Sequence, residues 1–268
     1  MNTFTFASWN VNSLRVRLPQ LIDWLGRRSP DAVVIQETKL VDEQFPVEVL
    51  KEAGYHVAFT GQKTYNGVAL LARAQTFEAP ADVVLNLPGY PDDQKRLVAA
   101  TLRPRTGEAP VRFIGGYIPN GNELGSWKYL YKLDWLDAAA RFLKDELSAH
   151  PRVVMGGDFN IAPDDRDVYD VKLWTERVLT SRAERRALNR LLALGLSDSF
   201  RVLHPEAGQF SWWDYRQSAF LRDRGLRIDL LLVSEAVRTA LISAEIDKEP
   251  RALAQPSDHA PVLITFTA

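Results

Sequence analysis

Short apolar runs that each end in polar residues recur along this chain, and they constrain its fold more than any other feature. The run 152–155 leads to Asp158 and Asn160, and the run 32–35 leads to Glu37. Short apolar runs bounded by turn residues are typical of buried strands. If neighbouring strands pair, their polar ends can converge on one rim. The pattern therefore predicts a β-rich fold with a polar site at that rim.

A few helical segments interrupt the expected strands. Strands are expected near 4–9, 31–36, 66–73, 96–103, 111–117, 152–158, 227–233 and 260–266, and helices near 18–28, 126–147 and 181–195. The longest helix carries one apolar stripe formed by Trp127, Leu130, Leu133, Leu136, Ala140, Leu143 and Leu147. Because strands and helices do not alternate regularly, we expect one α/β domain over residues 1–268, with two mixed sheets packed face to face and helices outside.

Composition excludes several classes of protein. The chain has 268 residues and no cysteine, which excludes disulfides, thiolate zinc sites and a cysteine nucleophile. The N-terminus lacks the basic and long apolar regions of a signal peptide, and no apolar run approaches the ~20 residues of a membrane span. We therefore expect a soluble, cytoplasmic monomer that does not associate with membranes.

The charges are unevenly distributed, although the formal net charge is only −1. The stretch 177–227 contains ten arginines and five acidic residues. Such a stretch beside an acidic body could hold phosphates next to metal-binding carboxylates. A solvated, arginine-rich helix face explains the same stretch equally well.

Two polar strand ends carry residue types that metal-dependent hydrolysis needs. Glu37 is a candidate ligand for a magnesium-like ion, because hard cations prefer oxygen, although an exposed strand-end glutamate is the plainer interpretation of that residue alone. In strand-like geometry Asp158 and Asn160 share a face while Phe159 points into the core. Asp158 could then accept the proton of an attacking water, and Asn160 could donate to a phosphate oxygen. The alternative is an Asx turn that closes the strand.

His259 is the most suggestive of the four histidines, because it follows Asp258 in a loop that ends at a proline. An imidazole paired with a carboxylate keeps a fixed tautomer and can carry charge toward a phosphate. Asp229 stands inside an apolar run, where an unpaired carboxylate is costly, so His259 is its expected partner. A structural aspartate that caps a turn is the alternative. Tyr117 could donate its hydroxyl to a phosphate oxygen, although most strand-end tyrosines simply pack.

Eight short motifs occur along the chain in a fixed order. They are Trp9-Asn10-Val11-Asn12-Ser13-Leu14-Arg15, Gln36-Glu37-Thr38-Lys39, Tyr65-Asn66-Gly67-Val68-Ala69, Gly116-Tyr117-Ile118-Pro119-Asn120-Gly121, Gly156-Gly157-Asp158-Phe159-Asn160, Phe210-Ser211-Trp212-Trp213-Asp214-Tyr215-Arg216, Gly225-Leu226-Arg227-Ile228-Asp229 and Ser257-Asp258-His259-Ala260-Pro261. In register, these motifs closely resemble the exonuclease III family of DNA-repair nucleases, within the endonuclease/exonuclease/phosphatase superfamily. Each motif is weak alone, but together they span nearly the whole chain.

The resemblance implies a DNase I-like four-layer α/β sandwich and a hydrolase that uses Mg²⁺, with Mn²⁺ as a substitute. It implies that Glu37 is the principal metal ligand, with Asn10, Asn12 and Asp258 nearby and Asp158 and Asn160 as further candidates. It also implies that Asp158 activates water, that Asn160 and His259 stabilise the pentacovalent phosphate, that Asp229 orients His259, and that Tyr117 and Asn120 contact the scissile phosphate. Asn12 departs from the family, since some relatives carry Asp at this position. Asparagine removes a negative charge near the metal, which would weaken metal affinity.

The resemblance also indicates the substrate. Trp212, Leu226 and Ile228 match the family's apolar pocket for a base-less sugar, and such a pocket admits a flipped abasic deoxyribose but rejects a normal nucleotide by size. Arg216 and Lys39 are further substrate-binding candidates. Taken alone, Trp212 and Trp213 would more often be ordinary core aromatics. The segment 164–179 falls where family members differ and is expected to lie against DNA near the lesion.

The predicted function is therefore a bacterial-type, nucleoid-associated DNA-repair phosphodiesterase. Its expected substrate is duplex DNA with abasic sites or blocked 3′ ends. It would combine 3′→5′ exonuclease, abasic-site endonuclease and 3′-phosphatase activities in unknown proportion. Two alternatives stay open: a phosphatase or phosphodiesterase for small phosphorylated molecules or lipids, and a catalytically silent DNA-binding scaffold, against which the complete polar set argues.

Overall fold

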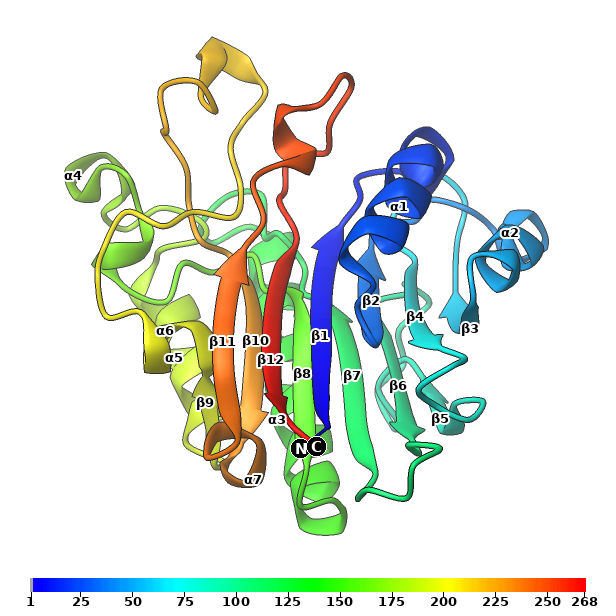
Figure 1. Ribbon diagram of the computed structural model, residues 1–268. Helices are drawn as coiled ribbons and strands as arrows, with labels where there is room; N and C mark the ends of the chain where they lie inside the picture. The colour runs from blue at the N-terminus through cyan, green and yellow to red at the C-terminus, as the bar shows by residue number, and fades with distance from the viewer. Residues whose placement is uncertain (1) are drawn as a thin grey trace.

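Two six-stranded sheets pack face to face in the computed structural model, which describes residues 2–268 (Figure 1). In spatial order the first sheet contains β11 (Leu241–Ile246), β12 (Val262–Thr267), β1 (Thr3–Asn10), β2 (Ala32–Gln36), β4 (Val68–Arg73) and β3 (Tyr55–Thr60). The second contains β5 (Ala81–Leu85), β6 (Leu97–Leu102), β7 (Val111–Tyr117), β8 (Val153–Asp158), β10 (Asp229–Ser234) and β9 (Leu196–Asp198). The pairs β1–β2 and β7–β8 are parallel and the other named pairs antiparallel, so both sheets are mixed, as predicted.

Helices cover the outer faces of both sheets. The α-helices are α1 (Leu14–Arg28), α2 (Val47–Glu52), α3 (Trp127–Ala149), α4 (Val171–Trp174), α5 (Arg182–Leu192), α6 (Ser199–Leu203) and α7 (Glu235–Arg238), and short 3₁₀ turns occur at Asp42–Gln44, Asp165–Asp167, Arg216–Ser218 and Pro250–Ala252. Trp24 of α1 and Leu50 of α2 belong to the apolar cluster on the first sheet. Trp135 of α3 and Leu188 of α5 belong to the cluster on the second. The order helices, sheet, sheet, helices is the four-layer sandwich that the resemblance implied.

The space between the sheets is filled by apolar side chains from the inner faces of both. Phe6 and Val34 come from the first sheet, and Phe113 and Val154 from the second, and all four are fully buried. The ring centroids of Phe6 and Phe113 are 4.7 Å apart. Because side chains alternate between the two faces of a strand, each strand can also supply residues to the helix-covered outer face.

The apolar stripe predicted for α3 is partly wrong. Trp127 and Leu130 are 69% and 60% exposed, whereas the buried face runs instead through Tyr129, Lys132 and Trp135. Trp127 and Leu130 lie in the first turn of the helix, and neither belongs to the apolar cluster that α3 forms with the second sheet. A buried lysine also interrupts the apolar pattern, so the spacing of the apolar residues alone misplaces the inward face.

Four strands were not predicted, namely β3, β5, β9 and β11. All four are edge strands. β11 and β3 form the two edges of the first sheet, and β5 and β9 form the two edges of the second. β5 and β11 are largely exposed or half-buried along their length. An edge strand with one open side needs few apolar residues, so it lacks the continuous apolar run that identified the central strands.

Strand register brings the polar strand ends to one rim. Tyr117 of β7 pairs in register with Asp158 of β8, and Asp158 pairs with Asp229 of β10. In the first sheet, Asn10 of β1 aligns with Gln36 of β2, the residue before Glu37. In Figure 1, β1 runs from the end of the molecule that holds both termini toward this rim.

Among residues 2–268, no helix combines the length and the apolar character that crossing a bilayer requires.

Candidate active site

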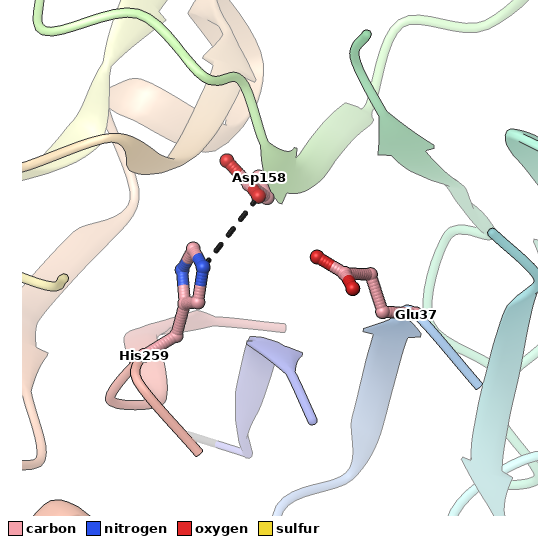
Figure 2. Close-up of side chains that lie close together, drawn as sticks. All are labelled: Glu37, Asp158 and His259. Carbon is pink, nitrogen blue, oxygen red and sulfur yellow. Dashed lines mark ion pairs between the residues drawn. The ribbon is translucent and has the colours of Figure 1, made fainter. Parts of the chain in front are cut away.

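Glu37, Asp158 and His259 point toward one another at the rim, although they come from the ends of β2 and β8 and the loop before β12 (Figure 2). One ligand atom from each lies within 4.8 Å of the others, and His259 Nε2 is 3.7 Å from Asp158 Oδ2. Asp158 and His259 are buried, whereas Glu37 is half-buried. The two carboxylates at this spacing offer oxygen ligands that fit a divalent cation, and the imidazole lies beside the same point.

Asn10 connects the two carboxylates across the two sheets. Its fully buried amide nitrogen donates to Glu37 Oε1 at 2.8 Å and to Asp158 Oδ2 at 3.0 Å. Its amide oxygen accepts a hydrogen bond from the backbone N–H of Asn12 at 2.9 Å. Asn10 was predicted as a metal ligand, and this structure places it beside both carboxylates as a hydrogen-bond donor.

Glu37 is held in its ionised form. Burial opposes the charge, but the Lys39 ammonium, 2.8 Å from Glu37 Oε2, and the Asn10 amide outweigh burial and hold the pKa of Glu37 below its usual range. Lys39 also donates to the amide oxygen of Asn12. Lys39 was predicted to contact substrate, and the structure places its ammonium against these two site residues.

Tyr117 donates its hydroxyl to Glu37 Oε1 at 2.9 Å. Burial raises the pKa of Tyr117 well above its usual value, and the carboxylates of Glu37 and Asp158 raise that pKa further. The hydroxyl therefore stays protonated over the working pH range and is available as a donor.

Asp158 and Asn160 were predicted to lie on one face of a continuing strand, but in the structure they lie in a turn. β8 ends at Asp158, and Asn160 adopts a left-handed backbone with φ of 50°. The backbone N–H of Asn160 donates to Asp158 Oδ1 at 2.8 Å, which is the Asx-turn alternative. The turn still brings both side chains together, because Asn160 Nδ2 donates to Asp158 Oδ2 at 3.1 Å. Phe159 is fully buried, as expected.

Burial raises the pKa of Asp158 to about 7, and the nearby His259 offsets only part of that effect while Asp229 and Glu37 add to it. Asn10 and Asn160 donate neutral hydrogen bonds to the carboxylate, so they do not offset its charge as a cation does. Asp158 is therefore poised to take up a proton near neutral pH.

Asn120 joins this group through its amide, which donates from Nδ2 to Asn160 Oδ1 at 2.8 Å. Asn160 Nδ2 in turn donates to the backbone carbonyl of Ile118 at 3.0 Å. The loops that follow β7 and β8 are thus bonded to each other through two asparagine side chains.

His259 is the partner of Asp229, as expected from the buried position of that carboxylate. The ring Nδ1 lies 2.9 Å from Asp229 Oδ2 and 3.1 Å from Oδ1. Burial disfavours the charged imidazole, but the carboxylates of Asp229 and Asp158 outweigh it and raise the pKa of His259 to about 10. The ring is thus a cation at neutral pH, with Nε2 directed toward Asp158.

Asn12 and Asp258 bond to each other beside the three-residue cluster. Asn12 Nδ2 donates to Asp258 Oδ1 at 2.9 Å, and the indole of Trp212 donates to Asp258 Oδ2 at 3.0 Å. Both oxygens of Asp258 therefore have protein partners here, one of which is the predicted pocket residue Trp212.

A hollow of about 630 Å³ opens next to Asn120, and Trp174, Arg177, Trp212 and Arg216 are among the residues that line it. Behind Trp212, the predicted pocket residues Leu226 and Ile228 are buried in the same apolar cluster. Trp174 brings the segment 164–179 to this hollow, and its expected contact with DNA stays a prediction. The side chain of Arg216 is 85% exposed and pairs with Asp214. Trp213 is fully buried, so the core interpretation holds for this tryptophan.

Two buried residues that hydrogen-bond to site residues were not identified from the sequence. Ser211 donates to Asp229 Oδ2 at 2.6 Å and accepts from the backbone N–H groups of Ile228 and Asp229. Lys132 donates to the backbone carbonyls of Asn120 and Asn160. For Lys132, the available sequence signal was the spacing that places this lysine on the buried face of α3.

A second hollow, of about 340 Å³, was also missed. It lies on the Tyr117 side of Asn120, and its lining includes Tyr65, Arg96 and Trp127. Tyr65 and Trp127 are each 69% exposed. Exposed aromatic rings beside a basic group are a surface on which bases stack.

Comparison with known proteins agrees with this geometry. Residues 7–259 match the model of the Endonuclease/Exonuclease/phosphatase family. Exodeoxyribonuclease III of Haemophilus influenzae is 37% identical over 270 residues, which cover 97% of this chain and 99% of that protein.

Two solved structures have the same fold over 99% of this chain and the whole of theirs. A 3′ phosphatase, NExo, from Neisseria bound to a product DNA hairpin is 45% identical with a TM-score of 0.94. An AP endonuclease from Archaeoglobus fulgidus is 33% identical with a TM-score of 0.91. The chain therefore belongs to the endonuclease/exonuclease/phosphatase family, and the family, the fold and the nuclease class predicted from its motifs are confirmed.

Proposed function

We propose that this protein is a magnesium-dependent DNA-repair phosphodiesterase that acts on duplex DNA with abasic sites or blocked 3′ ends. The observation that carries the proposal is the convergence of Glu37, Asp158 and His259 on one point, with Asn160 and Tyr117 as neighbouring donors. The similarity to a 3′ phosphatase with a product DNA hairpin and to an AP endonuclease supports DNA as the substrate class.

Glu37 would hold the metal ion, and the rest of the proposed oxygen set is Asn10, Asn12, Asp158, Asn160 and Asp258. When bound, a divalent ion supplies positive charge that offsets the charge developing on the phosphate, and it lowers the pKa of a bound water. All six side chains offer oxygen, the donor that Mg²⁺ prefers, and Mn²⁺ accepts the same ligands.

Asp158 is the proposed general base. Its pKa of about 7 suits the role, because a base works best when its pKa is close to the working pH. Asn10 and Asn160 fix the orientation of its carboxylate through hydrogen bonds to Oδ2. Asp158 would accept the proton of the water that attacks phosphorus.

His259 and three neutral donors would receive the charge of the pentacovalent phosphate. The imidazolium of His259, oriented by Asp229 through Nδ1, presents Nε2 to the site. Asn160, Tyr117 and Asn120 supply amide and hydroxyl donors. Donors held in place before the reaction lower its barrier, because they need little reorganisation as charge develops.

The larger of the two hollows beside Asn120, with a volume of about 630 Å³, is the proposed site for the sugar on one side of the scissile bond. Trp212 forms part of its wall, with Leu226 and Ile228 behind it. Arg177 and Arg216 line the same hollow and would contact DNA phosphates. We further propose that the protein works as a monomer in the cytoplasm, near the nucleoid.

The proposal is tested with labelled duplexes that carry an internal abasic analogue, a 3′-phosphate or a plain recessed 3′ end. Each is incubated with Mg²⁺, Mn²⁺ or EDTA, and the products are resolved on a denaturing gel. We expect metal-dependent cleavage that leaves 3′-hydroxyl ends, and the relative rates give the proportion of the three activities. If the folded protein cuts none of the three but releases phosphate from small phosphorylated molecules or lipids, the DNA-repair proposal is wrong.

A further inference from the structure

A buried lysine lies directly beneath the two asparagine loops of the site. Lys132 on α3 is fully buried, and its Nζ donates to the backbone carbonyl of Asn120 at 3.1 Å and to that of Asn160 at 2.7 Å. The third partner of Nζ is the carboxylate of Glu184, at 2.5 Å, on the first turn of α5. All three protons of the ammonium are thereby used.

Glu184 fixes a second set of chain segments to the same point. Its Oε1 also accepts from the backbone N–H of Leu179, which ends the segment that lines the larger hollow. Its Oε2 accepts from the backbone N–H and the hydroxyl of Ser181, the N-cap of α5. The pair thus ties the loop after β7, the loop after β8 and the 164–179 segment to two outer helices.

Helix capping explains only half of this arrangement. A glutamate at the third position of α5 needs no buried lysine to complete its capping box with Ser181. Burying an ammonium is costly, and burial lowers the pKa of Lys132 despite the opposing charge of Glu184. Both loop carbonyls that Lys132 binds belong to residues whose side chains bond to each other, from Asn120 Nδ2 to Asn160 Oδ1.

We propose that Lys132, paired with Glu184, is a positioning residue for the reaction, which sets the distance between Asn120 and Asn160 by binding the carbonyls of both. This inference rests on the proposed function, since it assigns those two amides to the phosphate. Lys132 does not touch substrate. The stem of Lys132 also lies close to the loop after β7: a Cβ at Gly121, where φ is +95°, would lie 3.3 Å from Lys132 Cδ.

The test uses the double variant Lys132→Met, Glu184→Gln. Met keeps the length of the lysine stem without its donors, and Gln removes the carboxylate that would otherwise be left unpaired. The matched control is Arg112→Met, Glu146→Gln. Like Lys132, Arg112 is a buried cation bonded to a glutamate, but this pair joins the start of β7 to the C-terminal part of α3 instead of joining α3 to α5, so it lies away from the two asparagine loops.

Turnover is measured under saturating substrate, at a temperature where circular dichroism shows every variant folded. We expect kcat of the Lys132 variant to fall at least ~10-fold, because misplacement of a contacting group by about 1 Å can cost 10²-fold. KM should stay within about 3-fold, since the affected contacts are those made to the transition state. The control should retain wild-type kcat at a similar loss of stability.

A second readout does not depend on activity. In protein labelled with ¹⁵N-asparagine, the side-chain amide signals of Asn120 and Asn160 should shift or broaden in the Lys132 variant and stay in place in the control. Wild-type kcat with unchanged signals, or an equal loss of kcat in the control, would overturn the proposal. Perturbed amide signals in a protein whose wild type cuts no DNA would instead contradict the proposed function.

If the double variant does not fold, Lys132→Arg provides the test. Arginine keeps a positive charge beside Glu184, but its guanidinium is planar, whereas the donors of the lysine ammonium are arranged tetrahedrally. It therefore cannot reproduce all three bonds that Lys132 makes to Glu184 and to the two loop carbonyls. Loss of kcat and the same two displaced amide signals are expected. A fully active Arg variant with unmoved signals would overturn the proposal.

Discussion

Asp158 is 1% exposed, and its carboxylate lies among the side chains of Asn10, Asn160 and His259. Three other residues of the rim, Asn12, Glu37 and Lys39, have left-handed backbones with φ between 43° and 55°. Non-glycine residues adopt this conformation at a cost, so it persists only where surrounding contacts fix it. At the scale of single residues, the rim therefore combines buried charge with strained backbone, as functional sites commonly do.

The Asp158→Asn variant tests the proposed base. The amide keeps the shape of the carboxylate but cannot accept the proton, so turnover of cleavable duplex should fall at least ~100-fold. The Kd for the same duplex in EDTA should change little, which fluorescence anisotropy measures. Asp82→Asn is the control, because the side chain of Asp82 is exposed and forms a surface ion pair with Arg103. Unchanged turnover in Asp158→Asn would remove this residue from the mechanism.

The charge of His259 can be followed directly in metal-free protein. Because the folded-state pKa is about 10 and the ordinary value is 6.5, the imidazolium adds stability that is complete below about 6.5 and is lost as pH rises through 10. We expect ¹⁵N NMR in EDTA to show a protonated ring at pH 8. The stability difference between wild type and His259→Gln, from urea unfolding, should be smaller at pH 10 than at pH 7.

Asp229→Asn provides the comparison for that titration. Among the groups that raise the pKa of His259, Asp229 makes the largest contribution. Its replacement should therefore move the titration of the ring to lower pH. A ring that is already neutral at pH 8 in wild type would show that burial outweighs the two carboxylates.

At the scale of elements, the β7–β8 pair decides where Asp158 lies. Asp158 occupies the last position of β8, in register with Tyr117, and the strand approaches it through Gly156 and Gly157. A Cβ on Gly157 would lie 2.0 Å from the backbone oxygen of Gly116. This close approach leaves room only for glycine, which is a physical reason for the Gly-Gly-Asp sequence.

Gly157→Ala should therefore destabilise the fold by about 2 kcal/mol or more, since overpacking against backbone cannot be relieved by moving a side chain. The free energy of unfolding in urea measures this. Gly26→Ala is the matched control, because Gly26 lies inside α1 and the added Cβ would meet no atom within 4 Å apart from its chain neighbours and the adjacent backbone of the helix. That change should be neutral or stabilising by up to ~1 kcal/mol. Equal stability of both variants would contradict the argument.

At the scale of the whole molecule, the two sheets each contribute one half of the rim. Glu37 and Asn10 come from the first sheet, and Tyr117, Asp158 and Asp229 from the second. The distance between Glu37 and Asp158 therefore depends on how the sheets pack, through contacts such as Phe6 against Phe113. This dependence of the site on both sheets supports our proposal that residues 1–268 form one domain.

DNA binding should be salt-dependent even though the net charge is −1. Local arginines such as Arg177 and Arg216 would displace counterions from phosphates, and each such contact steepens the loss of affinity with salt. We expect the Kd for an uncleaved duplex in EDTA to rise at least ~10-fold between about 50 and 200 mM salt. An affinity that does not change with salt would contradict the proposed phosphate contacts.

The sequence by itself determined the class of fold and the identity of the rim residues. Central strands have continuous apolar runs because both of their faces are buried, and the polar residues that end them are visible for the same reason. The expected partnership of Asp229 with His259 also followed from local chemistry, because a carboxylate inside an apolar run needs a partner. Edge strands were not predictable in this way because many of their residues are exposed or half-buried, and the inward face of α3 was not because a buried lysine interrupts its apolar pattern.

Only the tertiary structure decided how the rim residues connect. The bonds of Asn10 to Glu37 and Asp158 span 27 and 148 residues of chain, and that of Lys132 to Glu184 spans 52. Such contacts arise from strand register and sheet packing, which no local pattern encodes. The turn at Asn160 and the buried lysine beneath it exist because the loops after β7 and β8 meet in space, where their polar groups must find partners without water.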